Sequence, residues 1–494
     1  MKFISTRGQN EPVSSARAIY QGLAKDGGLF VPEHIPSINL QEIAALSSKP
    51  YHERAGIIIG KFLTDYAAQE LDYATSSAYS ANNFPTQVAP VVNIDNQYSV
   101  LELWHGKTSA FKDMALQILP YLLTIAMKKE QIDRQVLILV ATSGDTGKAA
   151  LEGFQDVPDT RIVVFYPEDG VSDIQKLQMA TQQGENVHVF AVKGNFDDTQ
   201  TGVKNIFANA DMNAQIAELG YQFSSANSIN WGRLVPQIVY YFSAYSDLVQ
   251  NKVIKLGDKI NFCVPTGNFG NILAGYYAKC MGLPVNKFIC ASNANNVLTD
   301  FINQGVYDRN RPFYQTNSPS MDILISSNLE RFLYLISGQN SALVADYMRQ
   351  LNETGRYEIP PELLAKVQQE MSGYCYDGAQ TCAEILDIYK NKQYLLDTHT
   401  AVAYKAAEDY RQQSGDQTHT VILSTASAFK FSQDVLVALE QDVAALNSFE
   451  QNRLLSKLSG QAIPTRIKQL EHAAIRHQTV IDKEQMFAAI KSIL

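Results

Sequence analysis

Short runs of β-branched and other apolar residues recur along the chain, and each is followed by a polar loop and a stretch with helical spacing. The clearest example is QVLILVATSGDTGKAALEGF, in which residues 136–140 are all apolar and a helical pattern begins at Lys148. An apolar run of this length is typical of a strand that is buried on both faces. The segment therefore predicts a strand, a Gly/Ser/Thr loop and a helix in succession.

Four further segments repeat this arrangement: RIVVFYPEDGVSDIQKLQMATQQ, NVHVFAVKGNFDDTQTGVKNIF, INFCVPTGNFGNILAGYYAKC and HTVILSTASAFKFSQDVL. Strands that alternate with helices predict an α/β fold, with two parallel or mixed sheets flanked by helices. In such sheets, ligands collect at the carboxyl ends of the strands. The polar loops are therefore the candidate sites of chemistry.

The domain organisation is predicted from changes in this pattern. A chain of 494 residues exceeds what one core usually organises. We predict a mostly helical N-terminal domain over 1–95, a smaller α/β domain over 96–220 and a larger α/β domain over 221–494. The larger domain includes a helix-rich, polar region at about 300–395, which we interpret as an insertion.

Composition narrows the function classes. Hydrophobic residues make up 46% and charged residues 18% of the chain, and no stretch has the length of a membrane span. The first residues turn polar at once, so we expect a cytoplasmic protein. A formal charge of −9 argues against general nucleic-acid binding. Five cysteines without a CxxC pair and eight histidines without HExxH spacing predict interior thiols and no metal site.

The loop PTGNFGN, residues 265–271, follows one predicted strand and opens a helix. Its backbone N–H groups and the positive end of the helix dipole can converge on a phosphate. It is not a Walker loop, because Asn271 stands where that motif has lysine. A helix start that is merely capped by Gly and Asn explains this loop equally well by itself.

Three other loops offer groups for an anion. TSGDTG, residues 142–147, carries hydroxyls and Asp145, although an Asp/Thr-capped turn explains it as well. NSINWGR, residues 227–233, ends in Arg233, which suits a phosphate or carboxylate; a surface ion pair is the alternative. STASAFKF, residues 424–431, is a third hydroxyl-rich strand end.

Two lysines precede an apolar helical stretch in HGKTSAFKDMALQILPYLL, residues 105–123. With Ser109 as N-cap, Lys112 falls in the first helical turn, where the helix terminus and burial lower an amine pKa. The alternative is a lysine that pairs with Asp113 and reaches water. Pro120 predicts a kink. A reactive amine, a phosphate loop and a group at a pyridine nitrogen are the parts of a pyridoxal-phosphate site.

The chain resembles the threonine synthase family, in the longer subgroup of bacteria and fungi. The motifs that carry the resemblance run almost from end to end: STRG, DGGLFVPEHIP, ELWHGKTSAFKD, ATSGDTG, NSINWGR, PTGNFGN, SPSMDI, SSNLERF, DTHTAVA and STASAFKF. The resemblance implies the fold of the tryptophan-synthase-β group (fold type II) with an additional N-terminal domain, and pyridoxal 5'-phosphate as cofactor.

The resemblance also implies roles for individual residues. Lys112 becomes the catalytic lysine that forms a Schiff base with the cofactor, Thr425 the partner of the pyridine nitrogen, and Asp145 a neighbour of the ring hydroxyl. The implied cofactor phosphate loop consists of Gly267, Asn268, Phe269, Gly270 and Asn271. The implied substrate-binding residues are Ser143, Thr146, Asn227, Ser228 and Arg233.

The reaction implied is the conversion of O-phospho-L-homoserine and water to L-threonine and phosphate, the last step of threonine biosynthesis. Another pyridoxal-phosphate elimination or replacement enzyme, such as a serine/threonine dehydratase, is one alternative, and a non-enzymic phosphoamino-acid sensor is another. Lys107 departs from the HGPT of the family; it is either a substrate-phosphate contact or a solvated loop lysine. We expect a small-molecule substrate, no nucleic acid or membrane partner, and a monomer or homodimer.

Overall fold

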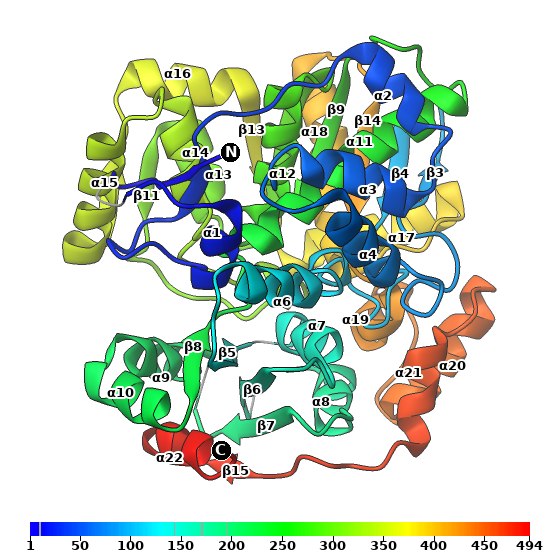
Figure 1. The fold of residues 1–494 in the computed structure, drawn as a ribbon. Helices are drawn as coiled ribbons and strands as arrows, with labels where there is room; N and C mark the ends of the chain where they lie inside the picture. The colour runs from blue at the N-terminus through cyan, green and yellow to red at the C-terminus, as the bar shows by residue number, and fades with distance from the viewer. Residues whose placement is uncertain (9–10, 143, 169–170, 195) are drawn as a thin grey trace.

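The structure is a computed structural model that describes residues 1–8, 11–142, 144–168, 171–194 and 196–494. Its two main sheets lie in separate units, one above the other in Figure 1. The upper, six-stranded sheet has the order β13-β10-β9-β14-β4-β3 and is parallel except for β3. Its strands are β3 (Val91–Asn93), β4 (Tyr98–Glu102), β9 (Ile260–Pro265), β10 (Val285–Ser292), β13 (Met371–Cys375) and β14 (Thr420–Ser424).

The lower, five-stranded sheet is parallel throughout, with the order β15-β7-β6-β5-β8. Its strands are β5 (Gln135–Ala141), β6 (Thr160–Pro167), β7 (Val187–Val192), β8 (Tyr221–Ser224) and β15 (Val480–Ile481). Leu137 and Ile138 are both buried but belong to different apolar clusters, as expected for a strand covered on both faces.

Helices cover both faces of each sheet. Those of the small unit are α7 (Asp145–Phe154), α8 (Asp173–Ala180), α9 (Phe196–Ala208), α10 (Ala210–Glu218) and α22 (Met486–Lys491). The large sheet has α11 (Trp231–Gln250), α12 (Gly270–Met281), α17 (Gly378–Lys392), α18 (Thr398–Ser414) and α19 (Ser432–Ala438). Between the two units lie α5 (Asp113–Leu116) and α6 (Leu119–Lys129) (Figure 1). No helix in the described residues combines the length and apolar character needed to cross a membrane.

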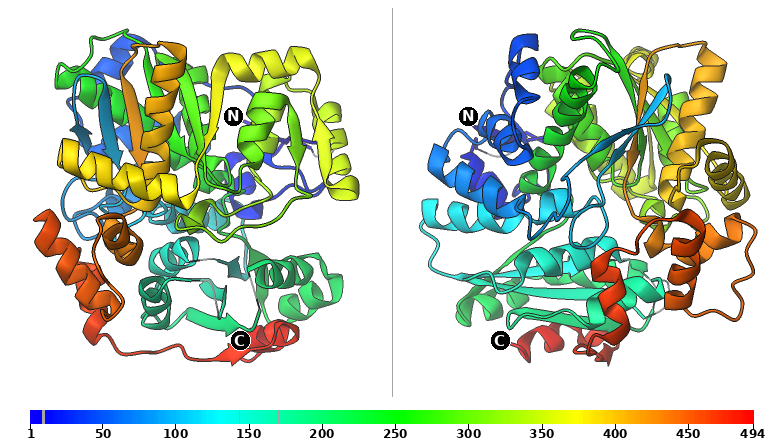
Figure 2. Two further views of the ribbon diagram at one scale, coloured as in Figure 1. Left: turned by 180° about the vertical axis from the view of Figure 1, so that it is seen from behind. Right: turned by 90° about the vertical axis from the view of Figure 1, so that its right-hand side faces the viewer.

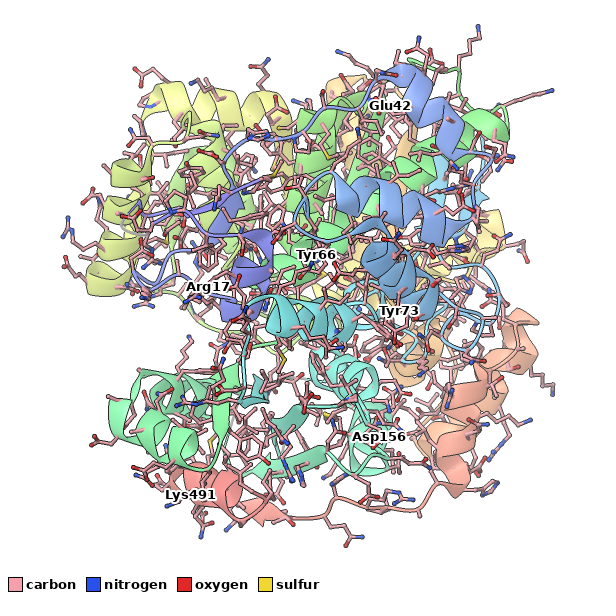
Figure 3. The ribbon with its side chains drawn as sticks, viewed as in Figure 1. Arg17, Glu42, Tyr66, Tyr73, Asp156 and Lys491 are labelled. Atoms are coloured by element: carbon pink, nitrogen blue, oxygen red, sulfur yellow. The ribbon has the colours of Figure 1, made fainter. Side chains whose placement is uncertain are left out.

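The N-terminal region packs on this framework. It consists of an antiparallel pair of strands, β1 (Phe3–Ser5) and β2 (Phe30–Pro32), with α1 (Ser15–Gln21) between them in the chain, followed by α2 (Leu40–Leu46), α3 (Tyr51–Gly60) and α4 (Ala68–Ala78). The Trp231 ring, at the start of α11, lies 5.2 Å from that of Phe3 and 5.4 Å from that of Phe62. Tyr66, labelled in Figure 3, donates its hydroxyl proton to the Leu122 carbonyl at 2.9 Å, which ties this region to α6.

All five predicted strand-loop-helix units are present, and the fold class is confirmed. The predicted helix after β5 begins at Asp145, three residues before Lys148, because Gly144 adopts φ 137° and turns the chain directly into the helix. Of the predicted interior thiols, Cys263 and Cys290 are buried, whereas Cys280 is exposed.

The predicted three-part division stays a prediction, but the sheets cross its boundaries. β4 lies within predicted 96–220 yet pairs with β14 of the large sheet, and β8 and β15, from predicted 221–494, complete the small one. The region at 300–395 supplies edge strand β13 as well as helices α14 (Leu329–Ile336), α15 (Ser341–Thr354) and α16 (Pro361–Glu370). It is therefore only partly an insertion.

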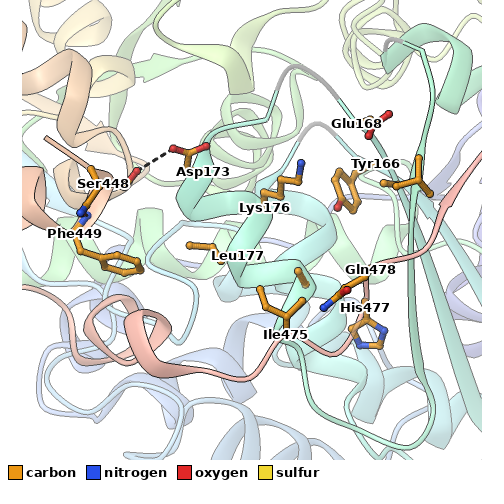
Figure 4. A pocket seen from close by; sticks show the side chains of 14 residues that line it. Tyr166, Glu168, Asp173, Lys176, Leu177, Ser448, Phe449, Ile475, His477 and Gln478 are labelled. Carbon is orange, nitrogen blue, oxygen red and sulfur yellow. Dashed lines mark hydrogen bonds between the residues drawn. The ribbon is translucent and has the colours of Figure 1, made fainter. Parts of the chain in front are cut away.

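The C-terminal segment connects the two units again. From α20 (Ser448–Ser459) and α21 (Thr465–Gln469) beside the large unit it returns to β15 at the edge of the small sheet (Figure 2). It forms one side of a half-open pocket of about 520 Å³ against α8, which is lined by both polar and apolar side chains. At its edge the Ser448 hydroxyl donates to Asp173 Oδ2 at 3.1 Å (Figure 4).

Candidate active site

Backbone hydrogen bonds hold the segment before Lys112 against the loop after β14. The Phe111 N–H donates to the Thr425 carbonyl at 2.8 Å, and the Ser427 N–H donates to the Ser109 carbonyl at 3.1 Å. Ser109 has φ 57° and is not the predicted N-cap; Lys112 itself occupies that position. Pro120 stands at the start of the separate helix α6 and does not kink a longer one.

Lys112 is partly buried, and no hydrogen bond or ion pair reaches its Nζ within the described residues. Its Nζ lies 4.6 Å from the centre of the Phe111 ring. Burial, together with the cations of Arg233 and Lys430, lowers the pKa of Lys112 to about 8, while Asp145 acts in the opposite direction. About a tenth of this amine is therefore uncharged at pH 7, far more than for an ordinary lysine.

Asp113 is not the partner of Lys112, so the predicted alternative of a lysine paired with it is wrong. The Asp113 side chain turns back and accepts the Thr108 N–H at 2.7 Å. Gly106 leaves the room for it, since a Cβ there would lie 2.5 Å from Asp113 Oδ2. Burial raises the pKa of Asp113 to about 6, although the Thr108 contacts lower it.

Asp113→Asn is expected to stabilise the protein at pH 8 but not at pH 4. Because the folded pKa of about 6 exceeds the ordinary 3.8, the native state binds more protons between these values. Aspartate's contribution to unfolding free energy is therefore lost as pH rises through this window, by up to about 3 kcal/mol. Asparagine still accepts the Thr108 N–H and carries no charge. Urea unfolding of both proteins at several pH values tests this, and a difference independent of pH would contradict it.

The loop from Gly267 to Asn271 has the geometry of an anion site. Phe269 adopts φ 61° directly before α12. Among the described residues, the N–H groups of Gly267, Asn268, Phe269 and Gly270 donate to no protein acceptor. A Cβ on Gly267 would lie 2.9 Å from the Ser320 carbonyl, so a larger residue would crowd the loop. Free N–H groups at a helix N-terminus suit a phosphate.

Asn271 completes this loop. Its Oδ1 accepts hydrogen bonds from the hydroxyls of Tyr240 at 2.6 Å and Tyr241 at 3.0 Å, which both lie on α11. Its buried Nδ2 has no protein partner in the described part of the chain. A buried amide nitrogen without an acceptor is costly, so this N–H group fits a ligand oxygen. The residues present thus fit a bound phosphate group.

Arg233, on α11, is a second group that is suited to an anion. It is 2% exposed, and its guanidinium donates to the Ala226 carbonyl at 2.5 Å, while Nε has no partner. No carboxylate in the described residues pairs with it, so the surface ion pair is wrong. Burial lowers its pKa to about 10. An unpaired buried cation requires an anionic ligand to offset its desolvation.

The loop before Arg233 is joined to the phosphate loop by one amide. Asn328 donates from Nδ2 to the Ser228 carbonyl at 3.2 Å and to the Asn268 carbonyl at 3.1 Å. Asn227 and Ser228 are both partly exposed. Asn328 thus connects the loop before Arg233 to the loop at 267–271.

The TSGDTG loop places Asp145 in the site. The Thr142 hydroxyl accepts the Gly144 and Gly147 N–H groups at 3.0 and 2.9 Å and shapes the turn. Thr146 is partly exposed at the start of α7, and Ser143 lies outside the described residues. Burial by itself raises the pKa of Asp145, but the Lys430 ammonium and a Gln175 hydrogen bond hold it below its usual value.

Several residues of the site have no role predicted from the sequence. Lys430 and Gln175 both bind Asp145 Oδ1, at 2.5 and 2.8 Å. His399 accepts the Ser320 N–H on Nε2 at 3.1 Å, and its Nδ1 lies 3.0 Å from Asp397 Oδ1. Both Lys430 and His399 lie in motifs quoted above, STASAFKF and DTHTAVA. The only local signal is at Lys430, a charged residue between Phe429 and Phe431; His399 stands between two threonines and offers none.

Two further predicted positions are placed as follows. Thr425 is 6% exposed, and no hydrogen bond of its hydroxyl is found among the described residues. Lys107 lies 3.7 Å from Glu152 of α7, so it is an ion-paired lysine and not simply a solvated one.

This fold and site define an α/β protein in which a lysine amine and two groups suited to anions lie between a parallel and a mixed sheet. Comparisons with known proteins agree. Residues 2–79 match the family model "Threonine synthase N terminus", and residues 400–493 match "Threonine synthase, C-terminal". The threonine synthase of Pseudomonas aeruginosa is 38% identical over 88% of this chain and 90% of its own. The chain belongs to the threonine synthase family.

Two further comparisons show how far the similarity extends. A structure described as PLP-bound threonine synthase from Brucella melitensis superposes with a TM-score of 0.88 at 34% identity, covering 100% of this chain and 99% of that one. Human threonine synthase-like 1 is 42% identical over 91% of this chain. The chain spans only 61% of the length of that relative.

Proposed function

We propose that this chain is a threonine synthase that converts O-phospho-L-homoserine and water to L-threonine and phosphate, with pyridoxal 5'-phosphate as its cofactor. One observation carries the proposal: an amine of lowered pKa shares its site with two separate anion-binding groups, the loop at 267–271 and Arg233. Such a site accommodates both a cofactor phosphate and a substrate phosphate. The similarity to threonine synthases over nearly the full length supports the same assignment.

The cofactor is assigned to the residues that fit it. The free N–H groups of the 267–271 loop and Asn271 Nδ2 bind its phosphate, and Lys112 holds it covalently. The Thr425 hydroxyl is assigned as the partner of the pyridine nitrogen, and Asp145 is assigned to the neighbourhood of the ring hydroxyl. When bound, the cofactor supplies an electron-accepting ring that stabilises negative charge at the substrate α carbon.

The protein's own groups then perform the proton and phosphate steps. Lys112, when it is not bound to the cofactor, would offer its Nζ as the base that removes the α proton. Loss of a proton from the β carbon then allows the phosphate to leave the γ carbon, which afterwards takes up a proton. Arg233 binds the substrate phosphate and stabilises its charge as it leaves. We assign substrate binding also to Asn227, Ser228, Thr146 and Ser143. Water later adds at the β carbon, so it must be kept out until then.

A product assay tests this function. Purified protein with added pyridoxal phosphate is expected to release phosphate and threonine from O-phosphohomoserine in equal amounts. Equal turnover of unphosphorylated homoserine would contradict the role of Arg233, and absence of both products would overturn the function. Lyase activity without threonine would identify a different enzyme of the same site.

The second candidate rests on the names of the relatives, because the human protein is described only as threonine synthase-like. The chain is 42% identical to the human threonine synthase-like 1 protein and 38% identical to the Pseudomonas threonine synthase. An enzyme that eliminates phosphate without adding water at the β carbon would use the same groups, and hydrolysis of its product would give phosphate, ammonia and a 2-keto acid. Measuring threonine and keto acid in the same sample separates the two.

We further propose a cytoplasmic location, supported by the five cysteines, all of which are free thiols. The proposed partner is the small-molecule substrate, and the chain acts as a monomer or a homodimer.

A further inference from the structure

Lys430 is a buried cation to which the proposed reaction assigns no role. It ends a single 3₁₀ turn, Ala428–Lys430, directly after β14 and is 1% exposed. Its ammonium donates to Asp145 Oδ1 at 2.5 Å and to the Thr108 carbonyl at 3.0 Å. Burying an ammonium is costly unless it is paired and hydrogen-bonded, so this position must be held by Asp145.

The pair joins the two sheet units. Asp145 starts α7 of the small unit, whereas Lys430 follows β14, a central strand of the large sheet. Gln178 of α8 also donates to the Thr108 carbonyl, at 3.4 Å. Helices α7 and α8 of the small unit and the 3₁₀ turn of the large unit therefore meet beside Thr108, in the segment that leads to Lys112. Separating the units would break the Lys430–Asp145 and Gln178–Thr108 contacts.

The contacts also orient Asp145 within the site. Lys430 and Gln175 both donate to Oδ1. Oδ2 has only a distant contact among the described residues, with the Ser320 hydroxyl at 3.5 Å. One carboxylate oxygen is thus fixed by the protein, and the other is left for a ligand.

We propose that Lys430 is a positioning residue: it fixes Asp145 in the site and latches the small unit onto the large one over Lys112. The latch itself follows from the contacts of Lys430, whereas its effect on turnover rests on the proposed function. Asp145 acts on the ligand, and Lys430 acts through Asp145. Loss of Lys430 leaves a buried carboxylate unpaired, which opens the units or protonates Asp145.

Hydrogen–deuterium exchange of the cofactor-loaded protein tests the latch. Lys430→Met is expected to speed amide exchange over 144–150 and 426–432 at least tenfold, and Asp145→Asn, which breaks the pair from the other side, is expected to do the same. Lys430→Arg should restore most of the protection. Lys148→Met is the matched control, because Lys148 is 8% exposed and pairs with Glu152 within the small unit. It should leave exchange over 426–432 as in the wild type.

Kinetics separate positioning from a merely structural role. In Lys430→Met, kcat for O-phosphohomoserine is expected to fall at least 30-fold, and the acidic limb of its pH profile should move to higher pH as the pKa of Asp145 rises. The double variant with Asp145→Asn should lose less than the two single losses combined. Wild-type exchange and a kcat within threefold of wild type in Lys430→Met would overturn the proposal. If the wild type does not turn over O-phosphohomoserine, the proposed function fails, and the exchange data still decide the latch.

Discussion

Lys112→Ala is expected to abolish both threonine formation and the visible absorption of the cofactor-loaded protein. The variant loses the covalent attachment and the base for the α proton, so kcat should fall about 10⁴-fold or more. Nothing else in the described site offers an uncharged amine, because the other nearby cations are ion-paired Lys430 and the guanidinium of Arg233. Absorption spectra before and after borohydride reduction, with a phosphate-release assay, measure both effects.

Lys107→Ala is the matched control for Lys112→Ala. Lys107 lies five residues earlier in the same segment but is 21% exposed and pairs with Glu152 at 3.7 Å. A partly exposed ion pair contributes little, so this variant should keep the yellow colour and a rate within about threefold of wild type. Lys112→Ala protein that still forms a borohydride-sensitive absorption band, or keeps more than one hundredth of the activity, would contradict the assignment.

The sequence predicted the elements of this fold where local pattern and tertiary burial agree. The apolar runs of β5, β6, β7, β9 and β14 are read directly, because strands buried on both faces must be apolar throughout. Edge strands escape such reasoning. Met371–Cys375 contains no β-branched residue, and β15 has two residues, so both depend on pairing with a neighbouring strand. The sequence of each segment by itself therefore does not predict that β13 and β15 belong to the sheets.

The site divides in a similar way. Lys112, the loop at 267–271 and Arg233 stand out because each follows a recognisable strand or opens a helix. The residues that hold the site together do not stand out in the sequence. Asp145 is held by a lysine 285 residues later in the chain, and the Ser320 N–H binds His399, 79 residues later. These pairings come from the packing of the two units and have no local spacing.

The same limit explains the wrong expectations about charge. Asp113 follows Lys112 directly, which suggested an ion pair, but the backbone turn at Gly106 sends its carboxylate to the Thr108 N–H. Arg233 seemed suited to a surface, but the long apolar helix α11 is almost wholly buried. In each case the assembled fold determines how deeply the charged group is buried. That burial determines whether the group pairs within the protein or is left for a ligand.

Arg233→Met is expected to lower kcat/KM for O-phosphohomoserine about 10²- to 10³-fold, the usual effect of removing one group that stabilises developing charge. The unliganded protein should nevertheless keep its melting temperature or gain a little. Arg233 makes one hydrogen bond to Ala226 and has no carboxylate partner among the described residues, so removing it relieves an uncompensated desolvation. Activity and stability should thus move in opposite directions, as expected for a group that is held ready for a ligand.

Arg331→Met is the matched control for the expected change in melting temperature. Arg331 is equally buried, but its guanidinium donates to the Phe30 and Ile229 carbonyls and to Asn328 Oδ1 at 2.9, 2.6 and 2.7 Å. Its removal leaves buried acceptors unsatisfied and should lower the melting temperature. Thermal unfolding and steady-state kinetics of both variants decide the matter. If Arg233→Met destabilises the protein as much as Arg331→Met, and phosphorylated and unphosphorylated substrates lose rate equally, Arg233 is a structural residue and the substrate phosphate binds elsewhere.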